Sequence, residues 1–163
     1  MGIDPPPLTP LAAAVLHVGT PERVLQIACG DGEGALFLAR EFPSARVRGI
    51  DADPAAIAVA SRRIGLDPEG RVAFKLGGPG RIPYPDDNFD LVAAVDARPA
   101  VGEVARVLHP GGHLVLAATA GAVTGRGPAA WLLARGLRAH GFERIAGERA
   151  GAGGFSVLRL SGP

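Results

Sequence analysis

Short apolar stretches alternate along the chain with longer segments whose apolar residues recur every three or four positions. The continuous stretches are typical of buried parallel strands, and the recurring pattern predicts helices with one face on a core. We predict strands at residues 24–28, 47–50, 72–76, 89–95 and 113–118, and helices at residues 11–18, 33–42, 54–64, 99–108 and 128–140. In the last helix we expect Trp131, Leu132, Leu133 and Leu137 to pack on the core.

The alternation of strands and helices predicts the topology. Parallel neighbours need crossover connections, so strands separated by helices form a parallel sheet with helices on both faces. Residues 144–148 and 155–160 flank a glycine-rich turn and predict a terminal antiparallel hairpin. Residues 1–10 contain four prolines, so we expect an extended or disordered lead-in followed by a single domain over residues 11–163.

A glycine-rich segment follows the first predicted strand. Gly30 and Gly32 let the backbone turn sharply and approach a ligand without an intervening Cβ, and the next helix directs its N-terminal amides at that ligand. Asp51 ends the second predicted strand about twenty residues later, where a carboxylate can accept hydrogen bonds from both ribose hydroxyls. A capping role for Asp51 is disfavoured because Asp53 and Pro54 supply the helix cap. The segment therefore predicts a nucleoside cofactor.

Charge and cysteine content narrow the possible partners. The 17 basic and 16 acidic residues give a net charge of +1 and form no basic run that could follow a nucleic-acid backbone. Cys29 is the only cysteine, so no internal disulfide can form, and we expect a packed residue rather than a nucleophile. No apolar stretch matches a signal peptide or a membrane span. We therefore expect a soluble cytoplasmic protein with no nucleic-acid or membrane partner.

Four blocks, at residues 24–34, 47–54, 82–92 and 103–112, resemble the class I S-adenosylmethionine-dependent methyltransferase family in their order and spacing. The resemblance covers about residues 11–163 and implies a Rossmann-like α/β fold. Its sheet would be seven-stranded and mostly parallel, in the order 3-2-1-4-5-7-6, with strand 7 antiparallel and helices on both faces. The first block alone also fits the G-x-G-x-x-A pattern of nicotinamide-binding domains, and the last two blocks favour the methyltransferases.

The resemblance also implies where the cofactor lies. It places the methionine part of S-adenosylmethionine against the glycine loop, the ribose on Asp51 and the adenine beside Ala52. Asp31 either orders the cofactor's amino group or is a solvated loop carboxylate. This chain has Gln26 and Gly78 where the family often has acidic residues, and Ala28 where it often has glycine. The implied cofactor residues are Ala28, Cys29, Gly30, Asp31, Gly32, Asp51, Ala52, Gly78, Pro79 and Val95.

The acceptor side has fewer signals. The connection from Asp90 to Glu103 is shorter than usual in the family, and no cap domain is inserted, so a small acceptor would be held by the first helix and nearby loops. A homodimer or a partner subunit could instead supply the missing wall. His17 and Asp96 are the candidate general bases. We expect no metal, because residues 117–119 lack the Asp-Asn pair of cation-dependent members.

These features predict methyl transfer from S-adenosylmethionine to a small-molecule acceptor. Methyl transfer depends chiefly on aligning the donor with the nucleophile, so it needs no obvious catalytic dyad. A first alternative is a non-catalytic or partner-dependent cofactor-binding domain, motivated by Gln26, Gly78 and the missing cap. A second alternative is an NAD-dependent oxidoreductase.

Overall fold

The structure is a computed structural model that describes residues 8–78, 80–121 and 128–162. Within these residues, no helix is long and apolar enough to cross a membrane. The helices are α1 (Thr9–Ala14), α2 (Glu33–Glu41), α3 (Pro54–Arg63), α4 (Val101–Val107) and α5 (Pro128–Ala139), and α1 continues into a 3-10 turn, η1 (Val15–His17). The strands are β1 (Arg23–Ile27), β2 (Arg46–Asp51), β3 (Val72–Leu76), β4 (Phe89–Val95), β5 (Leu108–Ala118), β6 (Phe142–Ala150) and β7 (Gly153–Leu160).

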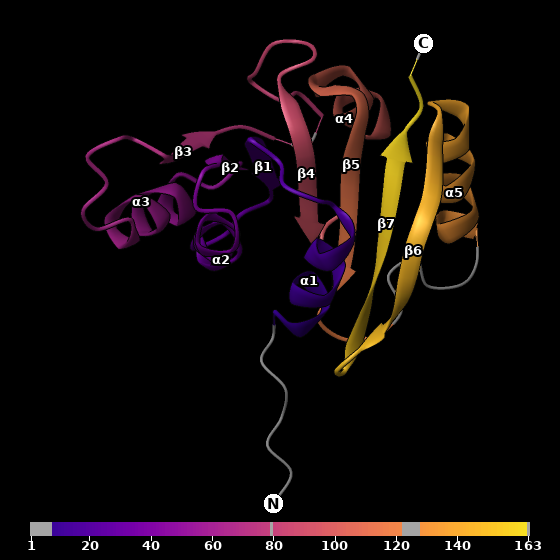
Figure 1. The fold of residues 1–163 in the computed structure, drawn as a ribbon, viewed down its shortest axis with the longest axis horizontal. Coiled ribbons are helices and arrows are strands. Elements are labelled where there is room, and N and C mark those ends of the chain that lie inside the picture. The colour runs from indigo at the N-terminus through magenta and orange to yellow at the C-terminus, as the bar shows by residue number, and fades with distance from the viewer. Residues whose placement is uncertain (1–7, 79, 122–127, 163) are drawn as a thin grey trace, which may run out of the picture.

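The strands form one seven-stranded sheet in the order β3-β2-β1-β4-β5-β7-β6 (Figure 1). The pairs from β3 across to β5 are parallel, and β7 runs antiparallel to both β5 and β6. The predicted fold class and strand order are therefore confirmed. The order also places β1 between β2 and β4, where the chain reverses its direction of travel across the sheet.

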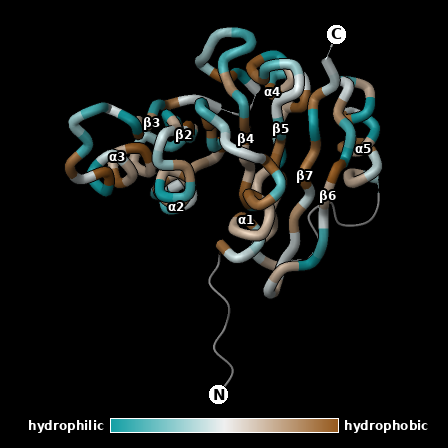
Figure 2. The backbone as a smooth tube through the Cα atoms, viewed as in Figure 1, coloured by the Kyte–Doolittle hydropathy of each residue, from teal (hydrophilic) through white to brown (hydrophobic). Residues whose placement is uncertain are grey.

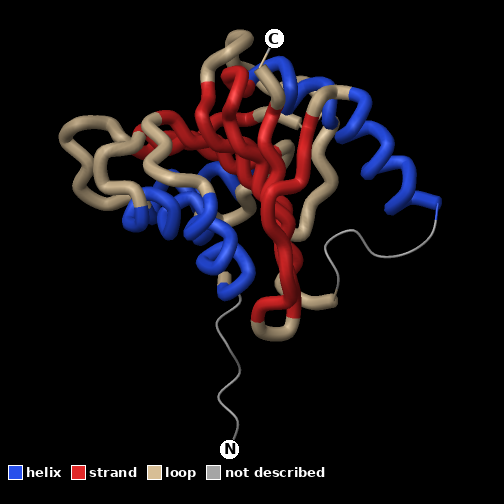
Figure 3. Tube along the Cα trace, turned by 45° about the vertical axis from the view of Figure 1, so that its right-hand side comes forward, coloured by secondary structure: helices blue, strands red, loops and turns tan. Residues whose placement is uncertain are grey.

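Helices cover both faces of the sheet, as Figure 3 shows with blue helices on either side of the red strands. The face with Val24, Val47 and Leu91 packs against α1 and α2, and the face with Leu25 and Val92 packs against α4 and α5. Figure 2 shows hydrophobic residues along the strands of the sheet. Side chains alternate between the two faces along each strand, so both faces of the central strands are buried.

Most predicted bounds differ from the observed ones by one or two residues, and two of the differences have a clear physical reason. Helix α1 begins at Thr9, inside the expected lead-in. Pro10 is tolerated at its second position because proline has no N–H, and the N–H groups of the first helical turn have no partner within the helix. Residues 1–7 lie outside the described residues. Strand β5 begins at Leu108 rather than His113, immediately after α4. Leu108 pairs with Phe89, and the register then shifts, so the Pro-Gly-Gly segment predicted as a loop is an irregular part of the strand.

The expected packing of α5 was also wrong in part. Leu137 is buried and Leu133 is partly buried, whereas Trp131 is 55% exposed and Leu132 is 59% exposed. The reason is the position of α5 at the β6 end of the sheet, where a single helical stripe faces the core. Leu133 and Leu137 are four residues apart and share that stripe. The exposed Trp131 ring instead lies 5.3 Å from the guanidinium carbon of Arg135.

Candidate active site

The residues predicted to hold the cofactor meet at the carboxyl ends of β1, β2 and β3. The Cys29 N–H donates to the Ile50 carbonyl at 2.9 Å, and the Gly77 N–H donates to the Asp51 carbonyl at 3.0 Å. These bonds join the loops after the three strands into one surface. Ligands of open α/β sheets bind in this position, beside the strand at which the chain reverses direction. Pro79 lies outside the described residues.

Asp51 is held directly against the glycine loop. The Gly30 N–H donates to Asp51 Oδ2 at 2.9 Å, and the Asp53 N–H donates to Asp51 Oδ1 at 2.9 Å. Asp53 caps α3 through a bond from the Ala55 N–H, which confirms the expected cap. Each oxygen of an ionised carboxylate has two acceptor positions, so both Asp51 oxygens can still accept a bond from a hydroxyl. The carboxylate is therefore fixed and suited to a ribose diol.

The two glycines of the loop differ in their surroundings. A Cβ on Gly30 would meet nothing within 4 Å, so this glycine faces open space. A Cβ on Gly32 would lie 2.8 Å from Phe74 Cζ and 2.9 Å from Ala60 Cβ, and the Gly32 φ is +88°. Gly32 is therefore needed for the close approach of β3 and α3 to the start of α2. Of the two, only Gly30 has the open space that a ligand requires.

Gln26 lies beneath the loop in an unusual state. Its side chain is 4% exposed, and its Oε1 has no hydrogen-bond partner among the described residues. Gly34, in the first turn of α2, leaves room for the Gln26 amide, because a Cβ there would lie 2.5 Å from Nε2. A buried acceptor without a partner is costly, so this position suits a ligand that brings an N–H donor. Together with Asp51, Gln26 fits the amino and hydroxyl donors of S-adenosylmethionine.

Two other residues of the loop are engaged with the protein. Asp31 pairs with Arg63 of α3 at 2.9 Å and accepts a bond from the Glu33 N–H at 3.2 Å. Cys29 is buried, and burial together with the nearby Asp51 charge raises the pKa of its thiol to about 11. A thiol with that pKa stays protonated at neutral pH, so Cys29 is a packed residue rather than a nucleophile.

The candidate bases lie on different elements. Asp96 follows β4, and its carboxylate accepts bonds from the Thr119 N–H at 2.8 Å and the Thr119 hydroxyl at 2.6 Å. His17 ends η1, where its ring lies 5.7 Å from the Phe155 ring. Asp96 is thus oriented at the carboxyl ends of β4 and β5, while His17 is exposed beside β7. Among the residues described, no group of three His, Cys, Asp or Glu side chains could hold a metal ion.

The other predicted residues lie around the same edge. Ala52 is exposed directly after β2, and Val95 is partly buried at the end of β4. Gly78 forms an isolated bridge with Arg81, and a Cβ on Gly78 would meet nothing within 4 Å. Gly78 itself is therefore open to a ligand.

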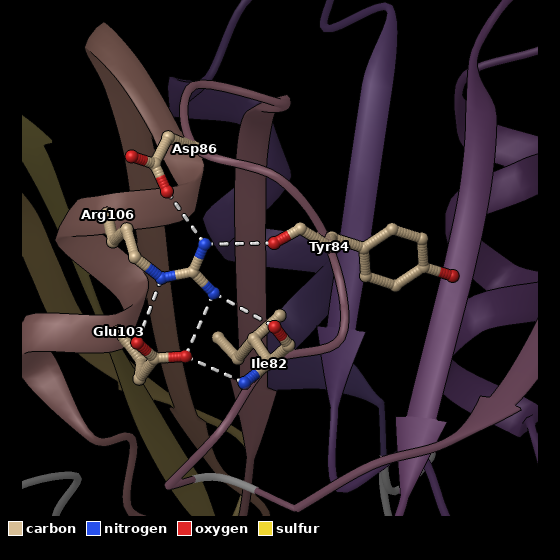
Figure 4. Close-up of polar contacts among 5 residues, drawn as sticks. All are labelled: Ile82, Tyr84, Asp86, Glu103 and Arg106. Carbon is tan, nitrogen blue, oxygen red and sulfur yellow. Dashed lines mark hydrogen bonds and ion pairs between the residues drawn. The ribbon is translucent and has the colours of Figure 1, made fainter.

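Sequence reasoning missed an ionic network that holds the segment after Gly78 (Figure 4). All five N–H groups of Arg106 donate hydrogen bonds: two to Glu103, one to Asp86 and one each to the carbonyls of Ile82 and Tyr84. Glu103 also accepts a bond from the Ile82 N–H at 2.8 Å. These bonds, chiefly those from Arg106, lower the pKa of Glu103 to about 2. The three-residue spacing of Glu103 and Arg106 on one helix was the available signal.

Comparisons with known proteins agree with this geometry. A family model described as "Methyltransferase domain" matches residues 24–112. Methyltransferase GfsG of Streptomyces halstedii is 36% identical over 134 residues, which cover 70% of this chain and 47% of that protein. The fatty-acid O-methyltransferase of Mycolicibacterium smegmatis is 37% identical over 101 residues, covering 58% of this chain and 36% of that protein.

A solved structure from Haloferax volcanii, a methyltransferase in complex with the Trm112 methyltransferase activator, has the same fold. Its TM-score is 0.78 at 17% identity, with 95% of this chain and 90% of that chain covered. This chain spans less than half the length of the curated relatives it matches. The residues that match the family model include the glycine loop, Asp51 and the Arg106 network. The chain therefore belongs to the class I S-adenosylmethionine-dependent methyltransferase family.

Proposed function

We propose that this protein transfers the methyl group of S-adenosylmethionine to a small-molecule acceptor. The observation that carries the proposal is the position of the Asp51 carboxylate, which accepts a bond from the Gly30 N–H at 2.9 Å. The Cβ position of the same Gly30 faces open space, which leaves room for a ligand. This arrangement lies at the edge of the sheet where the family binds its cofactor. The family match favours this function over hydride transfer with a nicotinamide cofactor.

The chain's own residues would bind and orient the reactants. Asp51 would accept bonds from the ribose hydroxyls, Gln26 Oε1 would accept a bond from the amino group, and the backbone at Gly78 would border the adenine. When bound, S-adenosylmethionine supplies a methyl group on a positively charged sulfur that a nucleophile can displace. Fixing two reactants in line can lower a barrier by about 7 to 11 kcal/mol, so orientation supplies most of the catalysis here.

The acceptor would approach from the ends of β4 and β5. Asp96 is held there by two bonds from Thr119, so it is oriented to take a proton from a hydroxyl or amine acceptor. The name of one relative, a fatty-acid O-methyltransferase, supports a small-molecule acceptor with an oxygen nucleophile. The short connection between Asp90 and Glu103 leaves few residues to close this side. A second copy of the chain or a partner subunit would complete the wall, and one structural neighbour was solved in complex with a methyltransferase activator.

The first test is calorimetric titration with S-adenosylhomocysteine and S-adenosylmethionine. We expect the wild-type protein to bind both ligands, and Asp51→Ala to bind at least tenfold more weakly, because a hydrogen bond to a charged group contributes about 1.5 to 3 kcal/mol. Glu41→Ala is the matched control, since it removes a carboxylate from an exposed position at the C-terminal end of α2. Thermal unfolding shows whether each variant is folded. No binding by the wild type at millimolar ligand, or equal affinity in Asp51→Ala, would contradict the proposal.

A turnover assay distinguishes a methyltransferase from the alternative, a domain that binds the cofactor without catalysis. The favouring observations are Gln26 and Gly78, at positions where the family often has acidic residues. A panel of fatty acids, phenols, amines and thiols, assayed for methyl transfer from labelled cofactor, distinguishes the two. Turnover of any acceptor supports the enzyme, whereas tight binding without turnover supports the alternative.

A further inference from the structure

A hollow lies at the opposite end of the strands from the cofactor loops, at the amino ends of β1 and β2. It has a volume of about 250 Å³ and is lined by Arg23, Arg46, Arg48, Tyr84, Asn88 and Phe89. Alternate residues of a strand share a face, so the three arginines lie on the face that carries Leu25 and Ile50. Helices α4 and α5 cover β5 and β6 on this face, and near the arginines the cover is the segment that contains Tyr84.

Two of the three guanidinium groups of this hollow, those of Arg23 and Arg46, have no polar partner among the described residues. Arg23 and Arg46 stand directly opposite each other on neighbouring strands, where like charges repel. Neither guanidinium forms a hydrogen bond or an ion pair within the part of the chain that the structure describes, whereas Arg63 pairs with a carboxylate. Arg48 uses one nitrogen for the carbonyls of Val47 and Arg71, at 3.1 and 3.0 Å, and approaches that of Gly70 at 3.5 Å.

The nearby carboxylates are engaged chiefly by backbone N–H groups. Asp90 accepts bonds from the N–H groups of Glu22 and Arg23, both at 2.9 Å, at the start of β1. Asp67 accepts a bond from the Val72 N–H at 2.9 Å, at the start of β3, and its charge also offsets part of the Arg48 charge. Neither residue lines the hollow, and none of the six described residues that do is acidic.

The aromatic wall of the hollow is fixed in place. The Tyr84 carbonyl accepts a bond from Arg106 at 2.9 Å, while its ring projects away from that guanidinium (Figure 4). The ring meets Phe89 edge to face at a centroid distance of 5.1 Å. Lys75 lies 5.1 Å from the same ring and donates to the Pro83 carbonyl at 3.1 Å, which adds a fourth cation beside the hollow. The aromatic wall is thus preformed, whereas the side chains of Arg23 and Arg46 are exposed at its mouth.

We propose that this hollow binds the phosphate group of a small ligand through Arg23, Arg46 and Arg48. Guanidinium groups present planar pairs of donors that match phosphate oxygens, and a bound dianion would relieve the repulsion between Arg23 and Arg46. Asn88 and Tyr84 add neutral polar residues to the lining. The hollow and the cofactor loops lie at opposite ends of β1 and β2, so this proposal does not depend on methyl transfer.

The test is calorimetric titration with pyrophosphate, inorganic phosphate and glycerol 3-phosphate at constant ionic strength, with chloride as the reference anion. We expect saturable binding of at least one phosphate probe to the wild type and at least tenfold weaker binding to Arg23→Gln/Arg46→Gln. The matched control is Arg40→Gln/Arg62→Gln, which removes the same charge from exposed positions on α2 and α3. Vesicles of phosphatidic acid show whether a lipid phosphate is accepted as well as a free one.

Binding that is lost equally in both double variants would show a general charge effect and overturn the proposal, as would binding by none of the probes. If Arg23→Gln/Arg46→Gln does not fold, Arg46→Gln alone and the NMR shifts of the wild-type arginine side chains replace it. Phosphate must then shift the Nε resonances of Arg46 and Arg48 more than those of Arg40 and Arg62. Equal shifts in the two pairs contradict the site. Titration with S-adenosylhomocysteine in the same variants should be unchanged.

Discussion

Replacing Arg106 with lysine should destabilise the domain by about 2 kcal/mol. The guanidinium donates five hydrogen bonds, and an ammonium group has only three donors and no planar fork. We expect lysine to keep one bond to Glu103 and one to a carbonyl, and to lose the other of each kind. Each lost bond contributes about 1 kcal/mol net. The pair with Asp86 adds little, because the Asp86 side chain is 74% exposed.

Urea unfolding followed by circular dichroism measures this loss. A change of 2 kcal/mol should lower the midpoint at constant slope and lower Tm by about 4 to 8 °C for a domain of this size. Arg62→Lys, on the exposed face of α3, is the control and should change stability by less than about 0.5 kcal/mol. A loss below 0.5 kcal/mol for Arg106→Lys would refute the reasoning, because the lost bonds would then be replaced by water at no cost.

The remaining predictions concern one glycine and one carboxyl. Gly32→Ala should lower the free energy of unfolding in urea by about 2 to 4 kcal/mol, because it combines a left-handed backbone with a clash at Phe74. Gly65→Ala, at φ +69° with open space around it, is the control and should lower that free energy by only about 1 kcal/mol. Equal losses would show that the clash relaxes freely. The Glu103 pKa is depressed from 4.5 to about 2, so its stabilisation is present above pH 4.5 and is lost as pH falls toward 2. Between pH 6 and 3, Glu103→Gln should therefore lose less stability than the wild type, and parallel profiles would contradict this assignment.

The fold could be predicted because its signals are local and repeated. Strands β3 and β4 have the predicted bounds, since each is a short apolar run bordered by polar or glycine residues. The same local signals failed at β5, where the Pro-Gly-Gly segment before the predicted strand is accommodated by a register shift between Phe89 and Leu91. They failed again at Trp131, because helical periodicity shows which residues share a stripe but not how far the sheet extends beneath the helix.

The site could be predicted only in outline. The link between Asp51 and the glycine loop follows from strand order, and the structure gives it as a 2.9 Å bond from the Gly30 N–H. The separate roles of Gly30 and Gly32 depend on Phe74 and Ala60, which are distant in sequence, so no local pattern could distinguish them. The basic hollow could not be predicted for the same reason, because Arg23 and Arg46 become neighbours only through strand pairing.

One segment connects the two ends of the sheet and therefore both sites. After β3 the chain passes Gly78, on the cofactor side, and reaches Tyr84 in the wall of the basic hollow before entering β4. Arg106 holds the carbonyls of Ile82 and Tyr84, so its bonds fix the middle of this segment. If that segment is loosened, ligand affinity should fall at both sites, because binding at either site must then also order the segment, which lowers its conformational entropy. Arg106→Lys should thus weaken S-adenosylhomocysteine and pyrophosphate together, whereas Asp51→Ala should weaken only the first and Arg46→Gln only the second.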